Sequence, residues 1–241
     1  MIVLFTDFGV ADPYVGQMHA VLASVAPQLP VIDLFHAAPN FDIRAAAYLL
    51  PAYTREFPVG TIFIGVVDPG VGGPRRPVML KADERWYVGP DNGLFHIVAR
   101  RAAASECYVI RWQAPRLSAS FHGRDLFAPV AARLARGEMA DAEPTTLTTP
   151  DGPPWPDDLA AILYIDHYGN AITGIRAAKL ASDQTLRMGK VIVKYARTFT
   201  EASPGTPFWY ENANGLVEIA LNRASVAKEC HLHTGDAVTV M

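Results

Sequence analysis

The stretch VVDPGVGGPRR at residues 66–76 places a carboxylate and two guanidinium groups on either side of a tight turn. Two β-branched residues lead into Asp68, and prolines and glycines separate it from Arg75 and Arg76. A plain turn needs the proline and a glycine, but it does not need these charges. The stretch therefore predicts a site for polar or ionic chemistry, held on a rigid loop at the end of a strand.

Four further groups carry acids, amides or a histidine at the ends of predicted elements. They are TDFG at 6–9, GPDNGL at 89–94, FHGRD at 121–125 and IDHYGN at 165–170. Each alone suits a turn, a helix start or a hairpin connection, and a lone His122 before a helix is more often a capping or packing residue. Their recurrence in both halves of the chain favours a functional site.

Signatures of several other chemistries are missing from the sequence. The histidines His36, His96, His122 and His167 are scattered, without HExxH or paired carboxylate spacing, so no metal is expected. There is no GxSxG elbow and no Walker A motif, and GVGG lacks the spacing and acidic partner of a dinucleotide fingerprint. We therefore expect no bound cofactor either.

The composition describes a globular chain, long enough for one large domain or two modest ones. Of 241 residues, 50% are apolar and 19% charged, and the net charge is −3. Such a chain lacks the basic surface that nucleic-acid binding needs, so no nucleic-acid partner is expected.

Cys107 and Cys230 form no CxxC pair, which favours a reducing compartment. Without a signal peptide, or an apolar run near the ~20 residues of a membrane span, we expect a soluble cytoplasmic protein with no membrane partner.

Strand-like and helix-like stretches alternate in the first part of the chain. The expected strands span residues 2–6, 30–35, 61–68, 77–82, 85–89 and 107–112. The expected helices follow Asp12-Pro13, interpreted as N-cap and first helical position, and span 41–57, with a bend at Pro51, and 123–137. This alternation predicts an α/β domain with a largely parallel sheet covered on both faces. Asp7 and Asp68 stand just past strand ends, where such sheets gather ligands.

A proline-rich stretch divides the chain. Residues 143–158 hold five prolines, which excludes a helix or an interior strand and predicts an interdomain linker. Short alternating runs follow it, and their spacing predicts a small β-barrel or sandwich. We therefore expect an N-terminal α/β domain at 1–150 and a smaller C-terminal β-barrel domain at 157–241.

Taken together, TDFG, DPGVG, GPDNGL, FHGRD and IDHYGNAIT resemble the S-adenosyl-L-methionine (SAM) hydrolases that form adenosine, also called SAM hydroxide adenosyltransferases. This family is related to the fluorinases and chlorinases, and the resemblance covers nearly the full length. It implies hydrolysis of SAM to adenosine and L-methionine by hydroxide attack on the ribose 5′ carbon. It also implies an N-terminal α/β sandwich-type domain, a C-terminal β-barrel and a homotrimer with active sites between subunits. Gly174 is a departure, since the family often has asparagine there.

The resemblance assigns catalytic roles to three residues. Asp68 would hold the attacking water and accept its proton or a hydrogen bond. Arg75 would stabilise the developing hydroxide through its fixed fork of donors. His122 would orient the water or relay its proton. Arg76 is expected to be a structural neighbour of this set.

Substrate contacts follow from the same matching. Asp7 would bind the ribose hydroxyls, and Phe41 would cover the ribose or adenine. Asp166 would hold the methionine ammonium, and Asn170 and the segment 212–225 would meet the adenine edge. The expected substrate-binding set is Asp7, Asp12, Tyr14, Phe41, Asp166, Tyr168, Asn170, Asn222 and Ala224, in which Asp12 or Tyr14 would help Asp166.

Three alternatives stay open on the sequence alone. A related halogenase would use the same fold and substrate, but a carboxylate at Asp68 would repel a halide, so Asp68 with His122 favours hydrolysis. A non-catalytic SAM- or adenosine-binding regulator would keep Asp7 and Asp166 without needing the catalytic set. A metal-dependent nucleotide hydrolase would use Asp7, Asp68 and His122 as ligands.

Overall fold

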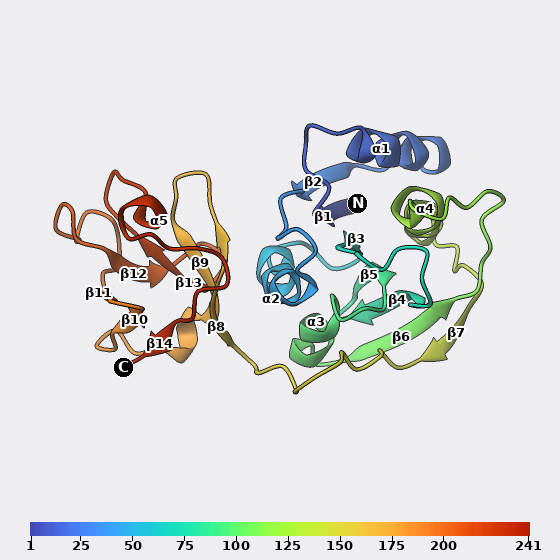
Figure 1. Cartoon of the computed structure of the whole chain (residues 1–241). Coiled ribbons are helices and arrows are strands. Elements are labelled where there is room, and N and C mark those ends of the chain that lie inside the picture. The colour runs from blue at the N-terminus through green and yellow to red at the C-terminus, as the bar shows by residue number, and fades with distance from the viewer. The chain divides into compact units, whose positions relative to one another are not determined.

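The computed structural model describes residues 1–241, and the chain forms two compact units. The N-terminal unit spans Met1–Gly152 and the C-terminal unit spans Pro153–Met241. Figure 1 shows a mixed α/β unit coloured blue to green and a mainly β unit coloured orange to red. The predicted fold class, an α/β domain followed by a smaller barrel-like domain, is confirmed.

The N-terminal unit is built around a seven-stranded sheet in the order β2-β1-β3-β5-β4-β6-β7. Its strands are β1 (Ile2–Thr6), β2 (Val31–Phe35), β3 (Ile62–Val66), β4 (Pro77–Ala82), β5 (Arg85–Pro90), β6 (Ser105–Ile110) and β7 (Ala142–Thr145). β2, β1, β3 and β5 run parallel, whereas β4, β6 and β7 pair antiparallel. The sheet is therefore mixed, and only one half of it is parallel as predicted.

The change to antiparallel pairing begins at the hairpin between β4 and β5. Asp83 and Glu84 alone connect these strands, with φ of 45° and 62°. A two-residue loop with both φ positive suits an antiparallel hairpin, whereas a parallel pair needs a crossover of about a dozen residues or more. The sequence prediction was incomplete here because two adjacent strand signals do not show how the strands pair.

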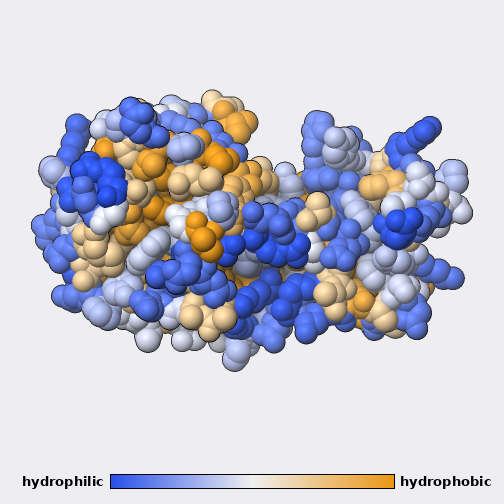
Figure 2. Space-filling model, turned by 180° about the vertical axis from the view of Figure 1, so that it is seen from behind, coloured by the Kyte–Doolittle hydropathy of each residue, from blue (hydrophilic) through white to orange (hydrophobic).

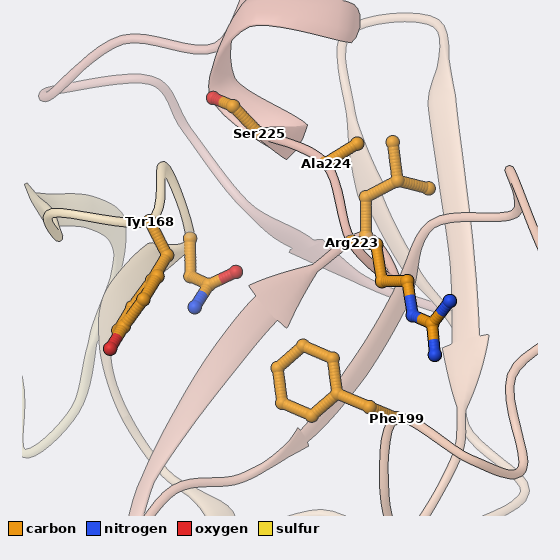
Figure 3. Close-up of a pocket in the computed structure, with 7 residues that line it drawn as sticks. Tyr168, Phe199, Arg223, Ala224 and Ser225 are labelled. Atoms are coloured by element: carbon orange, nitrogen blue, oxygen red, sulfur yellow. The ribbon is translucent and has the colours of Figure 1, made fainter.

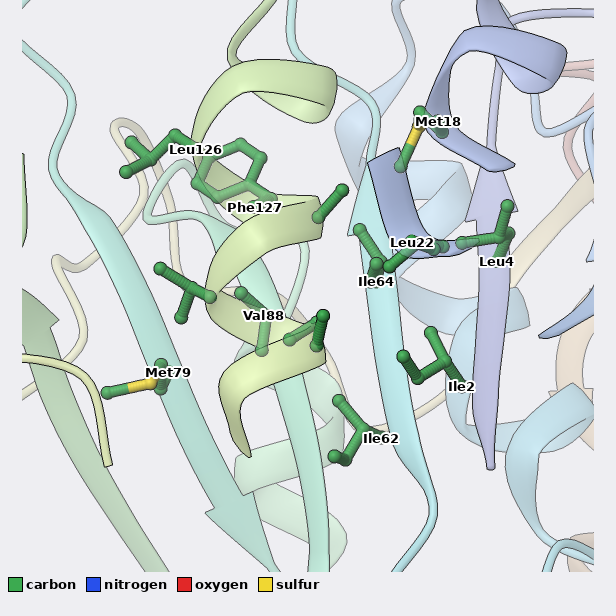
Figure 4. Close-up of a cluster of buried hydrophobic side chains, with 14 of the residues drawn as sticks. Ile2, Leu4, Met18, Leu22, Ile62, Ile64, Met79, Val88, Leu126 and Phe127 are labelled. Carbon is green, nitrogen blue, oxygen red and sulfur yellow. The ribbon is translucent and has the colours of Figure 1, made fainter. Parts of the chain in front are cut away.

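Helices cover both faces of this sheet. They are α1 (Tyr14–Val25), α2 (Ile43–Thr54), α3 (His96–Arg101), the π-helical turn η1 (Gly123–Phe127) and α4 (Ala128–Ala135). On one face, α1 and α4 pack on β1 and β3 through a core that includes Leu4, Leu22 and Phe127 (Figure 4). On the other face, the Tyr53 ring of α2 packs against Phe5 of β1, with ring centroids 6.5 Å apart. β1 and β3 are buried along their whole length, which fits their continuous apolar sequences.

The first helix begins one residue later than predicted, and Asp12 does not cap it. α1 starts at Tyr14 with Pro13 at the N-cap, and no side chain caps the helix. Pro13 already has helical φ and ψ of −73° and −8°, and its carbonyl accepts from the Gln17 amide at 3.0 Å. Proline therefore fixes the first turn through the backbone, and Asp12 stays exposed. α2 continues through Pro51 without interruption.

The stretch predicted as a linker, residues 143–158, begins inside a strand. β7 pairs with β6 at the edge of the sheet, and Pro144 lies opposite Tyr108 in that ladder. An edge strand tolerates proline because one of its two sides has no hydrogen-bond partner in the sheet. Residues 142–145 therefore belong to the N-terminal unit, and the division between the units falls after Gly152.

The C-terminal unit holds a second seven-stranded sheet, in the order β14-β10-β11-β12-β13-β9-β8. Its elements are β8 (Leu159–Ile165), β9 (Ala171–Arg176), the 3₁₀ turn η2 (Ala177–Lys179), β10 (Leu186–Met188), β11 (Val191–Tyr195), β12 (Phe208–Glu211), β13 (Leu216–Ala220), α5 (Val226–Glu229) and β14 (Thr239–Val240). Only β11 and β12 pair in parallel. Ile162 N donates to Asp236 O at 2.9 Å, and Gly235 N donates to Ile162 O at 2.8 Å. The chain before β14 thus pairs with β8 at the opposite edge, and the sheet nearly closes into a barrel.

Gly174 has a packing reason for lacking a side chain. It lies in β9 opposite Leu159 of β8. A Cβ atom at this position would stand 2.7 Å from both the Cβ and the carbonyl oxygen of Leu159. An asparagine would therefore require β8 to shift, and position 174 offers no polar side-chain contact to a ligand.

The surface and the thiols add three observations. None of the helices has both the length and the apolar character needed to cross a bilayer. Cys107 and Cys230 are both free thiols. Figure 2 shows apolar atoms gathered over part of the N-terminal unit, on the left of the view.

We expect Gly72→Ala to destabilise the protein by about 1–3 kcal/mol. Gly72 has a φ of +79°, and an added Cβ would collide with the Ala119 carbonyl oxygen, in the loop that precedes His122. Thermal and urea unfolding measure the loss. Gly16→Ala is the matched control, because a Cβ there meets nothing within 4 Å and alanine favours helix α1 by about 0.5–1 kcal/mol. Equal stability of the two variants would contradict the strain assigned to position 72.

Candidate active site

Asp68, Arg75 and His122 come together at the carboxyl end of β3. The Arg75 guanidinium donates through Nε and Nη2 to Asp68 Oδ2, at 3.0 and 2.5 Å. The same Nη2 donates to His122 Nδ1 at 2.8 Å. The side chains of Asp68 and Arg75 are only 4% and 10% exposed. The three residues expected to activate water thus form one connected cluster, in which the arginine joins the acid to the imidazole.

Two successive turns carry the chain from Asp68 back to its partner. Val71 N donates to Asp68 O at 3.2 Å, and a second turn over 70–73 follows with a backbone hydrogen bond of 3.0 Å. These turns reverse the chain, so that Arg75 reaches the carboxylate. The Phe127 ring supports the guanidinium, with its centroid 5.5 Å from Arg75 Cζ. The glycine-rich loop therefore positions the ion pair.

Arg76 pairs with a different acid. Its Nε and Nη2 donate to Asp91 Oδ2 at 3.0 and 2.5 Å. The Asp91 side chain is fully buried and also accepts from Thr148 N at 3.0 Å and Thr148 Oγ1 at 2.7 Å. This pair fastens the segment that follows β7, so Arg76 is a structural residue. Contact with Asp68 therefore distinguishes Arg75 from its neighbour.

The GPDNGL motif supports the strand from which Asp68 projects. Asn92 Nδ2 donates to Val67 O at 2.9 Å, and Asn92 Oδ1 accepts from Leu94 N at 3.3 Å. The amide thus fixes the backbone directly before Asp68. Asp91 pairs with Arg76, so both polar residues of the motif, Asp91 and Asn92, have structural roles.

The surroundings of His122 favour its neutral form. Burial and the adjacent Arg75 lower the pKa of the imidazole, while Asp68 and Asp125 partly oppose that shift. Because arginine can only donate, His122 Nδ1 accepts the hydrogen bond and carries no proton. The neutral ring therefore carries its proton on Nε2, where it can donate a hydrogen bond.

Asp7 emerges from β1, the strand next to β3. Burial raises the pKa of the Asp7 carboxyl, and the Asp68 charge adds to the shift. A hydrogen bond of 3.1 Å from Phe41 N to Asp7 Oδ2 opposes it. Phe41 adopts a φ of 62°, and the residue is 73% exposed. Asp7 therefore combines partial burial with a fixed backbone donor.

A cavity of about 600 Å³, the N-terminal cavity, lies beside these two carboxylates. Its lining includes Asp7, Tyr14, Phe41 and Asp68, all of which the sequence placed in the candidate site. Of the catalytic cluster, Asp68 is the member that lines it. Asp12 does not line the cavity, because the helix starts beyond it and its side chain stays at the surface.

An aromatic wall of the N-terminal cavity contains two rings, Phe8 and Phe121, that were not foreseen from the sequence. The rings of Phe8, Tyr14 and Phe121 pack at steep angles, with centroids 5.4 to 5.8 Å apart. Arg124 lies over the Phe121 ring at 4.9 Å and donates to Gln17 Oε1. Phe8 and Phe121 belong to the TDFG and FHGRD motifs, so their position was a usable signal, but their residue type suggested ordinary packing.

The C-terminal unit contains a cavity of its own, of about 620 Å³. The residues that line this C-terminal cavity include Tyr168, Asn170, Phe199, Arg223, Ala224 and Ser225 (Figure 3). Tyr168, Asn170 and Ala224 belong to the expected substrate-binding set, whereas Asp166 and Asn222, from the same set, do not line the cavity. Phe199 was missed, because it lies in a loop without a motif. Arg223 belongs to the expected segment 212–225 but was not singled out, and it lies in a turn with a φ of 61°.

Asp166 anchors the hairpin loop between β8 and β9. Its Oδ1 accepts from Tyr168 N at 2.9 Å and Asn170 N at 2.8 Å, and its Oδ2 accepts from Asn170 Nδ2 at 3.0 Å. The loop docks on α5, where Ala227 N donates to Gly169 O at 3.0 Å. Gly169, with a φ of 84°, leaves no room for a side chain at that contact. Asp166 therefore shapes the loop that carries the predicted ligand contacts.

The metal-dependent alternative requires a set of ligands that converge on one point. No three His, Cys, Asp or Glu side chains of the structure gather into a group that could hold a metal ion. Asp7, Asp68 and His122 accordingly do not form such a group. Arg75 instead occupies the space between Asp68 and His122 and bonds to both.

Comparisons with known proteins find relatives along the whole chain. Family models of the SAM hydroxide adenosyltransferase N-terminal and C-terminal domains match residues 2–143 and 160–239. A protein of Salinispora arenicola named (R)-S-adenosyl-L-methionine hydrolase is 40% identical, over 98% of this chain and 95% of that protein. A Thermus thermophilus protein of the same name is 38% identical, over 98% and 97%. A crystal structure of an uncharacterized conserved protein from Thermotoga maritima has a TM-score of 0.86 at 28% identity, covering 100% of this chain and 99% of that one.

Fluorinases are more distant relatives. The fluorinase of Actinopolyspora mzabensis is 25% identical, over 100% of this chain and 96% of that protein. The higher identity to proteins named as hydrolases agrees with the carboxylate at Asp68, which suits water better than a halide. The comparisons therefore favour hydrolysis over halogenation.

We expect an NMR titration of the His122 imidazole to give a pKa below the ordinary value of 6.5. Arg75→Gln should raise this pKa, because it removes the adjacent cation and leaves the Asp68 carboxylate unpaired near the ring. Arg111→Gln is the matched control, since it makes the same change in an exposed pair with Glu143 and should leave the His122 pKa unchanged. If the His122 pKa is the same in Arg75→Gln as in the wild type, the contact between these two side chains is contradicted.

Proposed function

This chain belongs to the SAM hydroxide adenosyltransferase family, and we propose that Asp68, Arg75 and His122 activate the water with which it hydrolyses SAM. The enzyme is an S-adenosyl-L-methionine hydrolase, and its products are adenosine and L-methionine. The halogenase and the non-catalytic regulator are set aside because the more similar relatives are named as SAM hydrolases. The observation that carries the proposal is that Asp68 lines the N-terminal cavity while Arg75 holds it and contacts His122.

The cluster supplies one water molecule with an acceptor, a donor and a fixed positive charge. Asp68 accepts a hydrogen bond and then the proton, because it is the member that lines the cavity. The neutral His122 donates from Nε2 and orients the water oxygen. Arg75 stays charged throughout, so it stabilises the hydroxide as it forms without losing a proton.

Hydroxide then attacks the ribose 5′ carbon of SAM. A C–O bond of adenosine forms as the C–S bond breaks, and the bonding electrons go to the sulfur. Sulfur leaves as the neutral thioether of methionine, so the leaving group needs no acid. Because an anion and a cation neutralise each other in this step, a site that excludes bulk water favours the reaction. In-line positioning of the reactants supplies much of the remaining acceleration.

The substrate contacts divide between the two cavities. We infer that Asp7 binds the ribose hydroxyls, because only its Oδ2 is bonded to Phe41 N and carboxylate lone pairs remain for further donors. The exposed ring of Phe41 beside it supplies an apolar cover. Asp166 would receive the methionine ammonium and Asn170 the adenine edge, since one offers a negative charge and the other lines the C-terminal cavity.

We propose that the chain forms a homotrimer in which the N-terminal cavity of one subunit meets the C-terminal cavity of the next. Each cavity holds part of the expected substrate-binding set, with Asp7 in one and Asn170 in the other. Each cavity is lined by a large exposed ring, since Phe41 of the N-terminal cavity and Tyr168 of the C-terminal cavity are 73% and 75% accessible. Contact with another copy would cover such side chains, which supports a site shared between subunits.

We expect Asp68→Asn to slow SAM hydrolysis by roughly 10²–10⁴-fold, because an amide cannot take the proton of the water. Affinity for SAM should change little, since Asp68 is assigned to the water and not to the substrate. Single-turnover formation of adenosine measures the first effect, and calorimetry measures the second. Asp151→Asn, the same change at an exposed position, should alter neither. If the variant keeps more than about a tenth of wild-type turnover, Asp68 is only a turn residue.

Mixing two inactive variants tests the shared site. Asp68→Asn and Asp166→Ala chains, unfolded together and reassembled, should regain activity, because the intact N-terminal half of one meets the intact C-terminal half of the other. Random assembly from equal amounts should restore about a quarter of the wild-type sites. Steady-state adenosine formation measures the recovery.

The control mixture combines Asp68→Asn with His122→Ala and should stay inactive, because both defects lie in the same half. Native mass spectrometry would establish that each mixture contains hybrid oligomers. Hybrids of Asp68→Asn and Asp166→Ala chains without activity would place the whole site within one subunit.

A further inference from the structure

We propose that His36 is a positioning residue for SAM hydrolysis, which holds the loop that carries Asp7 against the loop that carries Phe41. It would act through Thr6 and fix the carboxylate that meets the ribose hydroxyls, although the imidazole lines neither cavity. The inference rests on the proposed contact between Asp7 and the ribose. It gives a role to a buried histidine that the reaction itself does not use.

His36 directly follows β2 and is 5% exposed. Its Nδ1 lies 2.8 Å from Thr6 Oγ1, and its Nε2 lies 3.0 Å from Asp33 Oδ1. In a regular strand, side chains three residues apart point to opposite faces. The ladder between β1 and β2 skips one residue between Asp33 and Phe35, and such a bulge redirects the side chains beyond it. The imidazole thereby reaches both Asp33 of β2 and Thr6 of β1.

The hydrogen bonds of this group run in one direction. Phe8 N donates to Thr6 Oγ1 at 3.2 Å, and the hydroxyl keeps its own hydrogen to donate. Because Thr6 is fully buried, this hydrogen needs an acceptor within the protein, and His36 Nδ1 supplies it. The neutral imidazole then carries its proton on Nε2 and donates it to Asp33. Burial raises the pKa of the Asp33 carboxyl, but hydrogen bonds from His19 and His36 outweigh it and lower the pKa, so the acid is an ionised acceptor.

Backbone hydrogen bonds join the loop after β1 to the loop after β2 at the same place. Gly9 N donates to His36 O at 2.7 Å, and Ala38 N donates to Thr6 O at 3.1 Å. Thr6 and His36 thus link the two loops through their backbones and through their side chains. A buried network in which every donor and acceptor has a partner makes the structure around it rigid.

Asp7 and Phe41 take their positions from this junction. Asp7 directly follows Thr6, and Phe41 lies in the loop that begins at His36. Phe41 N donates to Asp7 Oδ2 at 3.1 Å, and both residues line the N-terminal cavity. Loss of the imidazole would leave the buried Thr6 hydroxyl without its acceptor, which favours a shift of the loop that lets water reach it. Such a shift displaces the carboxylate, so binding should weaken chiefly for ligands that carry the ribose hydroxyls.

The test compares the dissociation constants of adenosine and 2′,3′-dideoxyadenosine for the full-length enzyme and for His36→Leu, measured by calorimetry. The analogue lacks both ribose hydroxyls, so the ratio of the two constants reports the Asp7 contact. We expect the wild type to bind adenosine on the order of 10²-fold more tightly than the analogue, and His36→Leu to reduce this ratio by roughly tenfold. A wild-type ratio near one would overturn the proposal. An equal loss of affinity for both ligands in the variant would also overturn it, because a merely structural role leaves the ratio unchanged.

His233→Leu is the matched control and should keep the wild-type ratio, because it makes the same change at a side chain that is 77% exposed. Two further variants cover the case in which His36→Leu does not fold, as judged by circular dichroism. Thr6→Val keeps the shape of the side chain without its hydroxyl and should lower the ratio, whereas Thr6→Ser keeps the hydroxyl and should preserve it. Equal ratios in these two variants would overturn the proposal.

Release of adenosine from SAM is measured on the same preparations. Hydrolysis by the wild type, together with an unchanged ratio in the variants, defeats this inference alone. Absence of hydrolysis by the wild type defeats the function on which the inference rests.

Discussion

The buried ion pair between Asp68 and Arg75 is the interaction on which the candidate site depends. Both side chains are almost wholly removed from water, at 4% and 10% exposure. Removing one partner of such a pair typically costs about 3–5 kcal/mol, because the other charge stays buried without compensation. The same guanidinium bonds to His122 and rests on the Phe127 ring. The acid, the imidazole and the glycine-rich loop are therefore held in place by a single arginine.

The sheet supplies the second constraint, because it decides which acids become neighbours. β1 and β3 are adjacent parallel strands, so Asp7 and Asp68 emerge at the same edge. Burial and the Asp68 charge raise the pKa of Asp7, and Arg75 balances only one of the two carboxylates. The remaining negative charge suits a substrate that carries a sulfonium cation. The C-terminal unit has a buried acid of its own, Glu218, which accepts hydrogen bonds from the Tyr210 hydroxyl and the Asn212 amide.

The motifs contain both scaffold and candidate site, and the sequence could not separate the two. Arg76 and Asp91 form a pair that fastens the chain after β7, although they stand in the same motifs as the proposed catalytic residues. Asp166 shapes its hairpin loop with the carboxylate that was expected to bind an ammonium. Asp12, Asp166 and Asn222 were placed in the site, but they line neither cavity. Sequence proximity therefore identified the loops more reliably than the individual side chains.

The sequence by itself determined the family and most strands of the N-terminal sheet, although it missed β7. The runs at 2–6 and 77–82 became strands with the predicted bounds, because a buried or alternating apolar pattern is a local signal, and the motifs span the whole chain in order. Only the tertiary structure decided that β4 turns back on β5, that Arg75 meets His122, and that Glu218 is bonded to Tyr210. These contacts join residues far apart in sequence or depend on strand register. No local sequence pattern predicts such contacts, because the residues that form them become neighbours only when the chain folds.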